Sequence, residues 1–324
     1  MKKFIKENYR FILVLILIVM VFYIKLPYFI LAPGGTINIT DRVEMEGYKK
    51  KKGSINMLYV SEYKATMVMY LYAKVMNYDI ENNSQRQISN ESINDVKKRE
   101  TLMRDNSLDM AIIAAYTEAG KKIEIKSKKN IVIGTMSDND FEVGDTILLV
   151  EGNECNSVKE IREIINTKAV GDTIKFKILR DNKELEIESK VYIEDNMKVV
   201  GIVVMTDYEY ELSPKINIKF NKKESGSSGG GMLALTIYNA ITKEDIIKGR
   251  KISGTGTISA DGTIGEIDGV KYKVMGAYKN NMDIVFVPSS NYKEAIDTKN
   301  KYHYDIDIVK VDNLKEVINY LKNN

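Results

Sequence analysis

The first apolar segment of the chain is an unbroken run from Phe11 to Ile24, which follows a basic N-terminus. A helix needs about 20 residues to cross a bilayer, and tyrosine and lysine at its ends favour the interfaces. We therefore expect residues 10–32 to form a transmembrane anchor, with residues 1–9 in the cytoplasm and the rest outside the cell membrane. A cleaved signal peptide is the alternative, but no clear small-x-small cleavage site follows the run.

The next segment, residues 36–119, combines one strand pattern with two helical patterns. A short strand is predicted near Ser54–Val60, followed by a helix from about Lys64 to Met76. Polar residues 81–92 indicate a loop. Residues 94–119 carry apolar side chains at helical spacing and predict a second helix.

From about residue 120 the apolar period changes to two, which predicts a β-rich module over residues 120–195. Ser157, with Glu160 three residues later, is typical of a helix N-terminus. Residues 173–179 and 183–191 alternate across Asp181-Asn182 and predict a hairpin. The segment from Val143 to Gly152, the helix and the strand after Gly171 together resemble a bacterial PDZ domain.

That resemblance implies a site for an extended peptide, which would add to an open strand edge beside the helix. The edge would be residues 130–134. The candidate peptide-binding residues are Ile131, Val132, Ile133 and Ile161.

A glycine-rich turn, Gly226-Ser227-Ser228-Gly229-Gly230, stands between a strand from Lys215 and a helix over residues 232–242. A serine before a helix is well placed for nucleophilic catalysis, because the backbone N–H groups there can stabilise an oxyanion. Gly226 and Gly229 allow unusual backbone angles and close approach of a substrate. A serine nucleophile needs a base, and both a histidine and a lysine are available. His303 lies in a charged, tyrosine-rich stretch that favours a surface position.

The lysine is favoured by a resemblance to the proteolytic domain of the Lon family over residues 200–324. The turn around Ser228, the segment Thr255-Gly256-Thr257-Ile258, the segment from Gly262 to Lys273, and Ile284–Pro288 match that family's motifs. By this resemblance Ser228 is the nucleophile, Lys271 the base and Thr255 the hydroxyl that holds the lysine in place. Lys271 must then be desolvated and distant from carboxylates. Lys273 matches the family's second lysine, and we expect it to be exposed.

Composition excludes several other classes. One cysteine and one histidine are too few for a disulfide framework or a Cys/His zinc site. A formal charge of +3 is too small to indicate a nucleic-acid-binding surface. The phosphate-binding motif Gly-x-x-x-x-Gly-Lys-[Ser/Thr] is missing from the sequence, so we expect no nucleotide and no cofactor.

The order of these parts resembles the bacterial membrane Lon-like proteases with a PDZ domain. The prediction is an α+β protein with an N-terminal transmembrane helix, a PDZ-like β-rich module and a Lon-type α+β protease domain, whose upstream part is residues 36–119. Its expected function is ATP-independent endopeptidase activity on unfolded or exposed segments of extracytoplasmic proteins. The alternatives are a non-catalytic PDZ-type peptide-binding membrane protein and a histidine-based esterase. The sequence leaves the physiological substrate and any homo-oligomer open.

Overall fold

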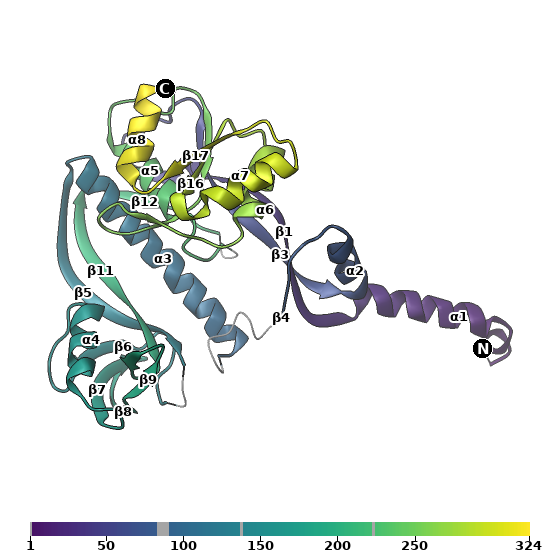
Figure 1. Ribbon diagram of the computed structural model, residues 1–324, viewed down its shortest axis with the longest axis horizontal. Coiled ribbons are helices and arrows are strands. Elements are labelled where there is room, and N and C mark those ends of the chain that lie inside the picture. Colours follow the sequence, from purple (N-terminus) through teal and green to yellow (C-terminus); the bar gives the residue numbers. More distant parts are fainter. Residues whose placement is uncertain (1, 83–90, 137–138, 222–223) are drawn as a thin grey trace.

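The computed structural model describes residues 2–82, 91–136, 139–221 and 224–324 (Figure 1). It contains an α/β body, a β-rich module joined to the body by two long strands, and an N-terminal helix that projects away from the body. Most of the loop expected at residues 81–92 lies outside the described residues.

The body is built on a six-stranded sheet in the order β17-β16-β13-β3-β1-β4. Neighbouring strands from β17 to β3 are parallel, whereas β1 pairs with both β3 and β4 antiparallel. The strands are β1 (Lys25–Asn38), β3 (Ser54–Thr66), β4 (Ile80–Asn82), β13 (Lys251–Gly254), β16 (Ile284–Pro288) and β17 (Asp307–Val311).

Helices cover both faces of this sheet. Ile284 and Phe286 of β16 face a core shared with α3, α5 and α8, whereas Val285 and Val287 face a second core shared with α6 and α7. A parallel strand buried on both faces is expected to be apolar throughout, as β16 is. The helices are α3 (Ile93–Glu118), α5 (Gly230–Ile241), α6 (Val270–Lys279), α7 (Tyr292–Lys301) and α8 (Leu314–Asn323).

Strand β3 lies between β1, from the N-terminal part of the chain, and β13, from its C-terminal part. Its first residues pair in parallel with β13, with Ser54 opposite Lys251 and Met57 opposite Gly254. Within the described residues, its later part pairs with β1 and with no other strand. The helix expected from Lys64 begins later than predicted, because β3 continues to Thr66 and α2 (Met67–Val75) is capped by the Thr66 hydroxyl.

The module is a five-stranded antiparallel sheet in the order β11-β5-β6-β7-β8, with α4 (Val158–Thr167) packed on it. The predicted hairpin is confirmed, with Arg180 of β7 opposite Lys183 of β8. Ser157 caps α4 by accepting from the backbone N–H of Glu160. The strands are β5 (Lys122–Thr135), β6 (Thr146–Val150), β7 (Thr173–Arg180), β8 (Lys183–Lys190) and β11 (Ile202–Ser213); the short strands β9 (Tyr192–Glu194) and β10 (Met197–Val199) form a separate pair.

The strand edge expected to be open at residues 130–134 is not open. Residues 202–206 of β11 pair along this edge of β5, and β6 pairs with Asn130 and Ile131 on the other side. Sequence could not show this, because the filling strand lies about 70 residues downstream. β5 and β11 then run on together to the body (Figure 1), where Ile123 and Leu212 pack against its core.

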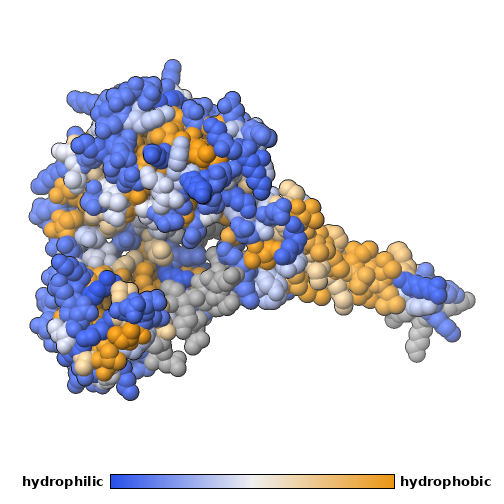
Figure 2. Space-filling view, viewed as in Figure 1, coloured by the Kyte–Doolittle hydropathy of each residue, from blue (hydrophilic) through white to orange (hydrophobic). Residues whose placement is uncertain are grey.

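The N-terminal part of the predicted fold is wrong. Helix α1 (Lys2–Tyr23) ends at Tyr23, and the residues that would complete an anchor belong to β1, which pairs with β3 and β4. The apolar part of the helix, from Phe11 to Tyr23, rises only about 20 Å. Among the described residues, no helix is both long and apolar enough to span a membrane. The prediction of a transmembrane anchor at residues 10–32 is therefore wrong, and the predicted single-pass membrane location falls with it. Apolar side chains of α1 are exposed along its length (Figure 2).

A half-buried carboxyl group joins the body to the long strands. The Tyr210 hydroxyl of β11 donates to Asp109 Oδ1 of α3 at 2.6 Å. Burial raises the pKa of Asp109 to about 7; the Tyr210 hydrogen bond opposes this shift, and the charges of Asp207 and Asp105 add to it. A pKa above its unfolded value means that this group's contribution to stability is lost as pH rises towards 7.

Asp109→Asn should therefore lose less stability between pH 5 and pH 8 than the parent chain, by about 2 kcal/mol. Thermal unfolding at the two pH values measures the difference. Glu118→Gln, which removes an exposed carboxylate of the same helix, should follow the parent. An equal pH response in Asp109→Asn and the parent would contradict the assignment.

Candidate active site

Ser228 lies in the turn before α5, at the point where the sequence predicted a nucleophile. The chain reaches this turn from β12 (Ile216–Ile218), and Gly229 is the N-cap residue of α5. Gly226 has a φ of +84°, which favours glycine. Ser228 is therefore placed at a helix N-terminus, where the helix dipole favours developing negative charge.

A cleft of about 410 Å³ opens beside Ser228. One wall is the turn itself, from Glu224 to Gly229, and the opposite wall is strand β3 from Met57 to Val60. Polar and apolar groups contribute to its lining in nearly equal shares, and Arg104 and Glu224 supply charge. Gly226, Ser228 and Gly229 thus share one cleft, which is lined further by Thr36, Ile37, Phe220 and Leu233.

The glycines of the turn allow its close packing. A Cβ on Gly229 would lie 2.2 Å from Met57 Sδ. A Cβ on Gly230 would lie 2.9 Å from the backbone nitrogen of Ile258 and 2.7 Å from Ser107 Oγ. The turn can approach β3 and α3 only because these side chains are missing.

Thr255 supports the serine backbone rather than the lysine. Its Oγ1 donates to the Ser228 carbonyl oxygen at 3.0 Å, and the N–H of Gly256 donates to the same oxygen at 2.8 Å. Thr255 itself is 1% exposed. The role expected for its hydroxyl is therefore corrected: it fixes the carbonyl of the candidate nucleophile.

Lys271 does not meet the requirements stated for it as a base. Its Nζ lies 3.7 Å from Asp79 Oδ1 and donates to the Asn77 carbonyl oxygen at 3.1 Å. Its side chain is 23% exposed. The amine is therefore neither fully desolvated nor distant from a carboxylate.

Lys273 meets the first of those requirements, desolvation, and the expectation that it is exposed is wrong. It is 3% exposed, and burial lowers its pKa to about 8, opposed by the charge of Asp268. Within the described residues no carboxylate forms an ion pair with its amine. A buried amine without a counter-ion is partly neutral near pH 8, as a general base must be.

The same stretch of β3 borders both Ser228 and the helix of Lys273. Val270 and Val274 of α6 pack on Leu58, and a Cβ on Gly269 would lie 2.9 Å from Val60 Cγ2. Leu58 and Val60 also line the cleft. Among the described residues, however, no side chain makes a hydrogen bond to the Ser228 hydroxyl. Catalytic hydrogen bonds in free enzymes are often long and shorten only when substrate binds.

His303, the base of the esterase alternative, is exposed at the end of α7. No histidine is among the described residues that line the cleft. The structure thus offers no support for a Ser228–His303 pair.

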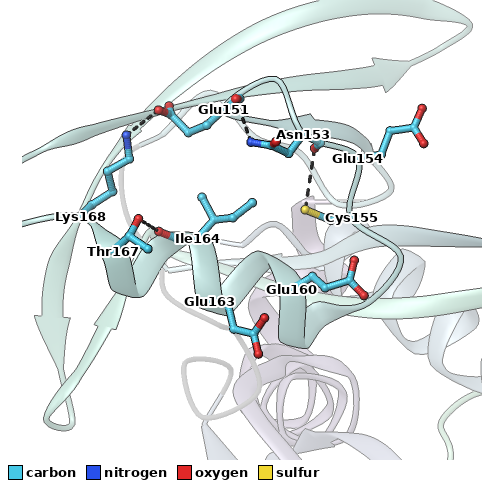
Figure 3. A pocket seen from close by; sticks show the side chains of 9 residues that line it. All are labelled: Glu151, Asn153, Glu154, Cys155, Glu160, Glu163, Ile164, Thr167 and Lys168. Carbon is cyan, nitrogen blue, oxygen red and sulfur yellow. Dashed lines mark hydrogen bonds and ion pairs between the residues drawn. The ribbon is translucent and has the colours of Figure 1, made fainter.

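The four candidate peptide-binding residues of the module fall into two pairs that differ in burial. Val132 and Ile161 are buried in the module's own core, at 0% and 3% exposure, while Ile131 and Ile133 are half-buried on the other face of β5. A separate pocket of about 480 Å³ lies between α4 and the segment after β6 (Figure 3). Its carboxylates include Glu151, which pairs with Lys168. These four isoleucine and valine positions therefore form no common groove.

Sequence reasoning missed two kinds of residue in this site. The cleft wall from Met57 to Val60 has no motif, since its role arises from pairing with β1 and β13. Lys273, by contrast, had a signal: with Val270, Val274 and Ala277 it falls on one helical stripe, and that stripe is buried.

Comparison with known proteins identifies the class. A model of the Lon protease (S16) C-terminal proteolytic domain matches residues 121–323, which is more than half of the chain. The chain belongs to this family, and the predicted enzyme class, a Lon-type serine endopeptidase, is confirmed at that level.

Individual relatives agree with this assignment. The Lon protease of Mesomycoplasma hyopneumoniae (strain 232) is 31% identical over 98 residues, covering 30% of this chain and 11% of the relative. The Lon protease of Aster yellows witches'-broom phytoplasma (strain AYWB) is 24% identical over 268 residues, covering 72% of this chain and 32% of the relative. The chain therefore spans a third or less of the length of these relatives.

The similar solved structures include isolated PDZ domains, which cover about a quarter of this chain. A PDZ domain of an SdrC-like protein from Listeria monocytogenes is 23% identical and covers 25% of this chain and 92% of that structure, with a TM-score of 0.23. The corresponding domain from Listeria innocua is 27% identical, with a TM-score of 0.22. Scores this low do not establish a PDZ fold.

The tight packing of the turn gives a test. Gly230→Ala should destabilise the fold by about 1–3 kcal/mol, because its Cβ would meet backbone and Ser107. Gly231→Ala is the matched control: its Cβ would lie 3.4 Å from Ile264 Cδ1, an ordinary contact. Thermal unfolding of both variants measures the contrast, and equal stability of the two would contradict the packing described.

Proposed function

We propose that the chain is an endopeptidase in which Ser228 attacks the scissile carbonyl and Lys273 is the general base. The observation that carries the proposal is the burial of Lys273, which lowers its pKa to about 8, on the helix that packs against the cleft wall. In this mechanism the neutral amine takes the proton of the Ser228 hydroxyl as the acyl–oxygen bond forms. The same amine then returns a proton to the leaving nitrogen, and water hydrolyses the acyl-enzyme.

The cleft favours a substrate in extended conformation. β3 is paired with β13 only up to Met57, so Leu58–Val60 have a strand partner on one side only within the described part of the chain. An unpaired strand edge binds an extended peptide through backbone hydrogen bonds. Such a substrate is an unfolded segment, a tail or an exposed loop. The sequence carries no nucleotide-binding motif, so cleavage is proposed to be independent of ATP.

The domain organisation follows from the same sheet. We propose that residues 36–119 are the upstream part of the proteolytic domain and that the module is an insertion in it. Support comes from the pairing of β3 with β13 and the packing of α3 on α5. The alternative of a non-catalytic peptide-binding protein is not favoured, because the strand edge on which it depended is filled by β11.

Three lysine variants test the base. Lys273→Ala should reduce cleavage of an unfolded protein such as casein to the level of Ser228→Ala, and Lys273→Arg should fail as well, since guanidinium does not deprotonate. Lys271→Ala should keep most of the activity. Loss of activity in Lys271→Ala together with an active Lys273→Ala would overturn the assignment and favour Lys271.

The pH profile provides a second test. The base is active when neutral, so kcat/KM should rise with pH through the lowered pKa of Lys273, about 8, and level off above it. Peptide cleavage measured between pH 6 and 10 gives the inflection. A flat profile across this range would contradict a buried lysine base.

A further inference from the structure

One stripe of helix α3 contacts the turn that carries Ser228. Glu100, Arg104 and Ser107 are spaced by four and three residues, so they lie on the same face of the helix. The Glu100 carbonyl oxygen accepts from the N–H of Gly226 at 3.1 Å, and its carboxylate accepts from Ser225 Oγ at 3.0 Å. Arg104 donates to the Glu224 carbonyl oxygen at 3.0 Å.

Ser107 makes the contact nearest to the nucleophile. Its hydroxyl donates to the Ser227 carbonyl oxygen at 3.2 Å, and the N–H of Gly230 donates to the same oxygen, also at 3.2 Å. The peptide group between Ser227 and Ser228 is planar, so holding its carbonyl also holds the N–H of Ser228. On the other side of Ser228, Thr255 and Gly256 hold the next carbonyl.

These contacts constrain both peptide planes that flank Ser228. Its φ and ψ are then fixed, and the direction of its Cα–Cβ bond is fixed with them. The side chain of Ser228 is not itself bound by any described residue, so this backbone constraint sets the position of its Cβ, about which the hydroxyl rotates.

The position of Ser107 fits such a role. The side chain is 4% exposed, and its hydroxyl is directed to the turn. Thr101, on the same helix, instead donates to the carbonyl oxygen of Lys97 four residues earlier, the usual local partner of a hydroxyl in a helix. The absence of a side chain on Gly230 leaves the room in which Ser107 Oγ lies.

We propose that Ser107 is a positioning residue for Ser228: its hydroxyl orients the Ser227–Ser228 peptide and so directs the nucleophile towards its base. This inference rests on the proposed function of Ser228. Reaction rate depends steeply on such alignment, whereas substrate binding along β3 does not involve Ser107.

Ser107→Ala tests the inference in the full chain. We expect kcat to fall about tenfold with KM unchanged, because alignment is lost and the binding wall is intact. The rate at which a fluorophosphonate labels Ser228 should fall by the same factor. The inflection of the pH profile should stay where it is, since Lys273 is not altered. Ser107→Thr, which keeps the hydroxyl, should restore most of both rates.

Thr101→Ala is the matched control, a hydroxyl removed from an exposed position of the same helix, and should match the parent. If Ser107→Ala does not fold by thermal unfolding, Ser107→Cys keeps the volume with a weaker donor and should show the same loss. Parent-like kcat and labelling in a folded Ser107→Ala or Ser107→Cys would overturn the inference. A parent chain that is not labelled at Ser228 would instead refute the proposed nucleophile.

Discussion

The parallel pairing of β3 with β13 is the constraint on which the arrangement of the site depends. It joins a strand that begins at Ser54 to one that begins at Lys251, with the whole module between them in sequence. Where β13 ends, β3 continues, and its residues from Met57 to Val60 become a wall of the cleft. The opposite wall is the Ser228 turn, which is held to the same body by α3 and by the segment after β13. Without this pairing the nucleophile would face no substrate surface.

Lys271 and Lys273, at the start of α6, differ in burial and therefore in their suitability as a general base. They are two residues apart, and a helix turns about 200° over that interval, so they point to different sides. Lys271 reaches the loop after α2, where its Nζ donates to the Asn77 carbonyl oxygen and lies 3.7 Å from Asp79 Oδ1. Lys273 faces the packed interior, where the ammonium loses hydration and its pKa falls. The same residue type thus makes polar contacts from a half-buried position at one site and is a buried candidate base at the other.

Much of the fold was readable from local pattern. The hairpin of β7 and β8, the capped helix α4, helix α3 and the helix after Ser228 follow alternation, helical period and capping, which depend on neighbours in sequence. The errors arose where distant segments decide. Residues 25–32 have the apolar character of a membrane segment, but they pair with β3 as a strand; residues 202–206 fill an edge that looked open from the module's own sequence. The choice between Lys271 and Lys273 depended on which face of α6 is buried, and the apolar stripe containing Lys273 was the available clue.

The central claim is that Lys273 is held as a partly neutral amine, and its titration tests this directly. In the Ser228→Ala chain, where no acyl-enzyme can form, the ¹³Cε resonance of Lys273 can be followed with pH and assigned by its loss in Lys273→Ala. The account predicts a midpoint near 8, well below the value of about 10.4 for a lysine in water. A midpoint near that ordinary value would contradict the account, because the amine would then be charged at the pH where it must accept a proton.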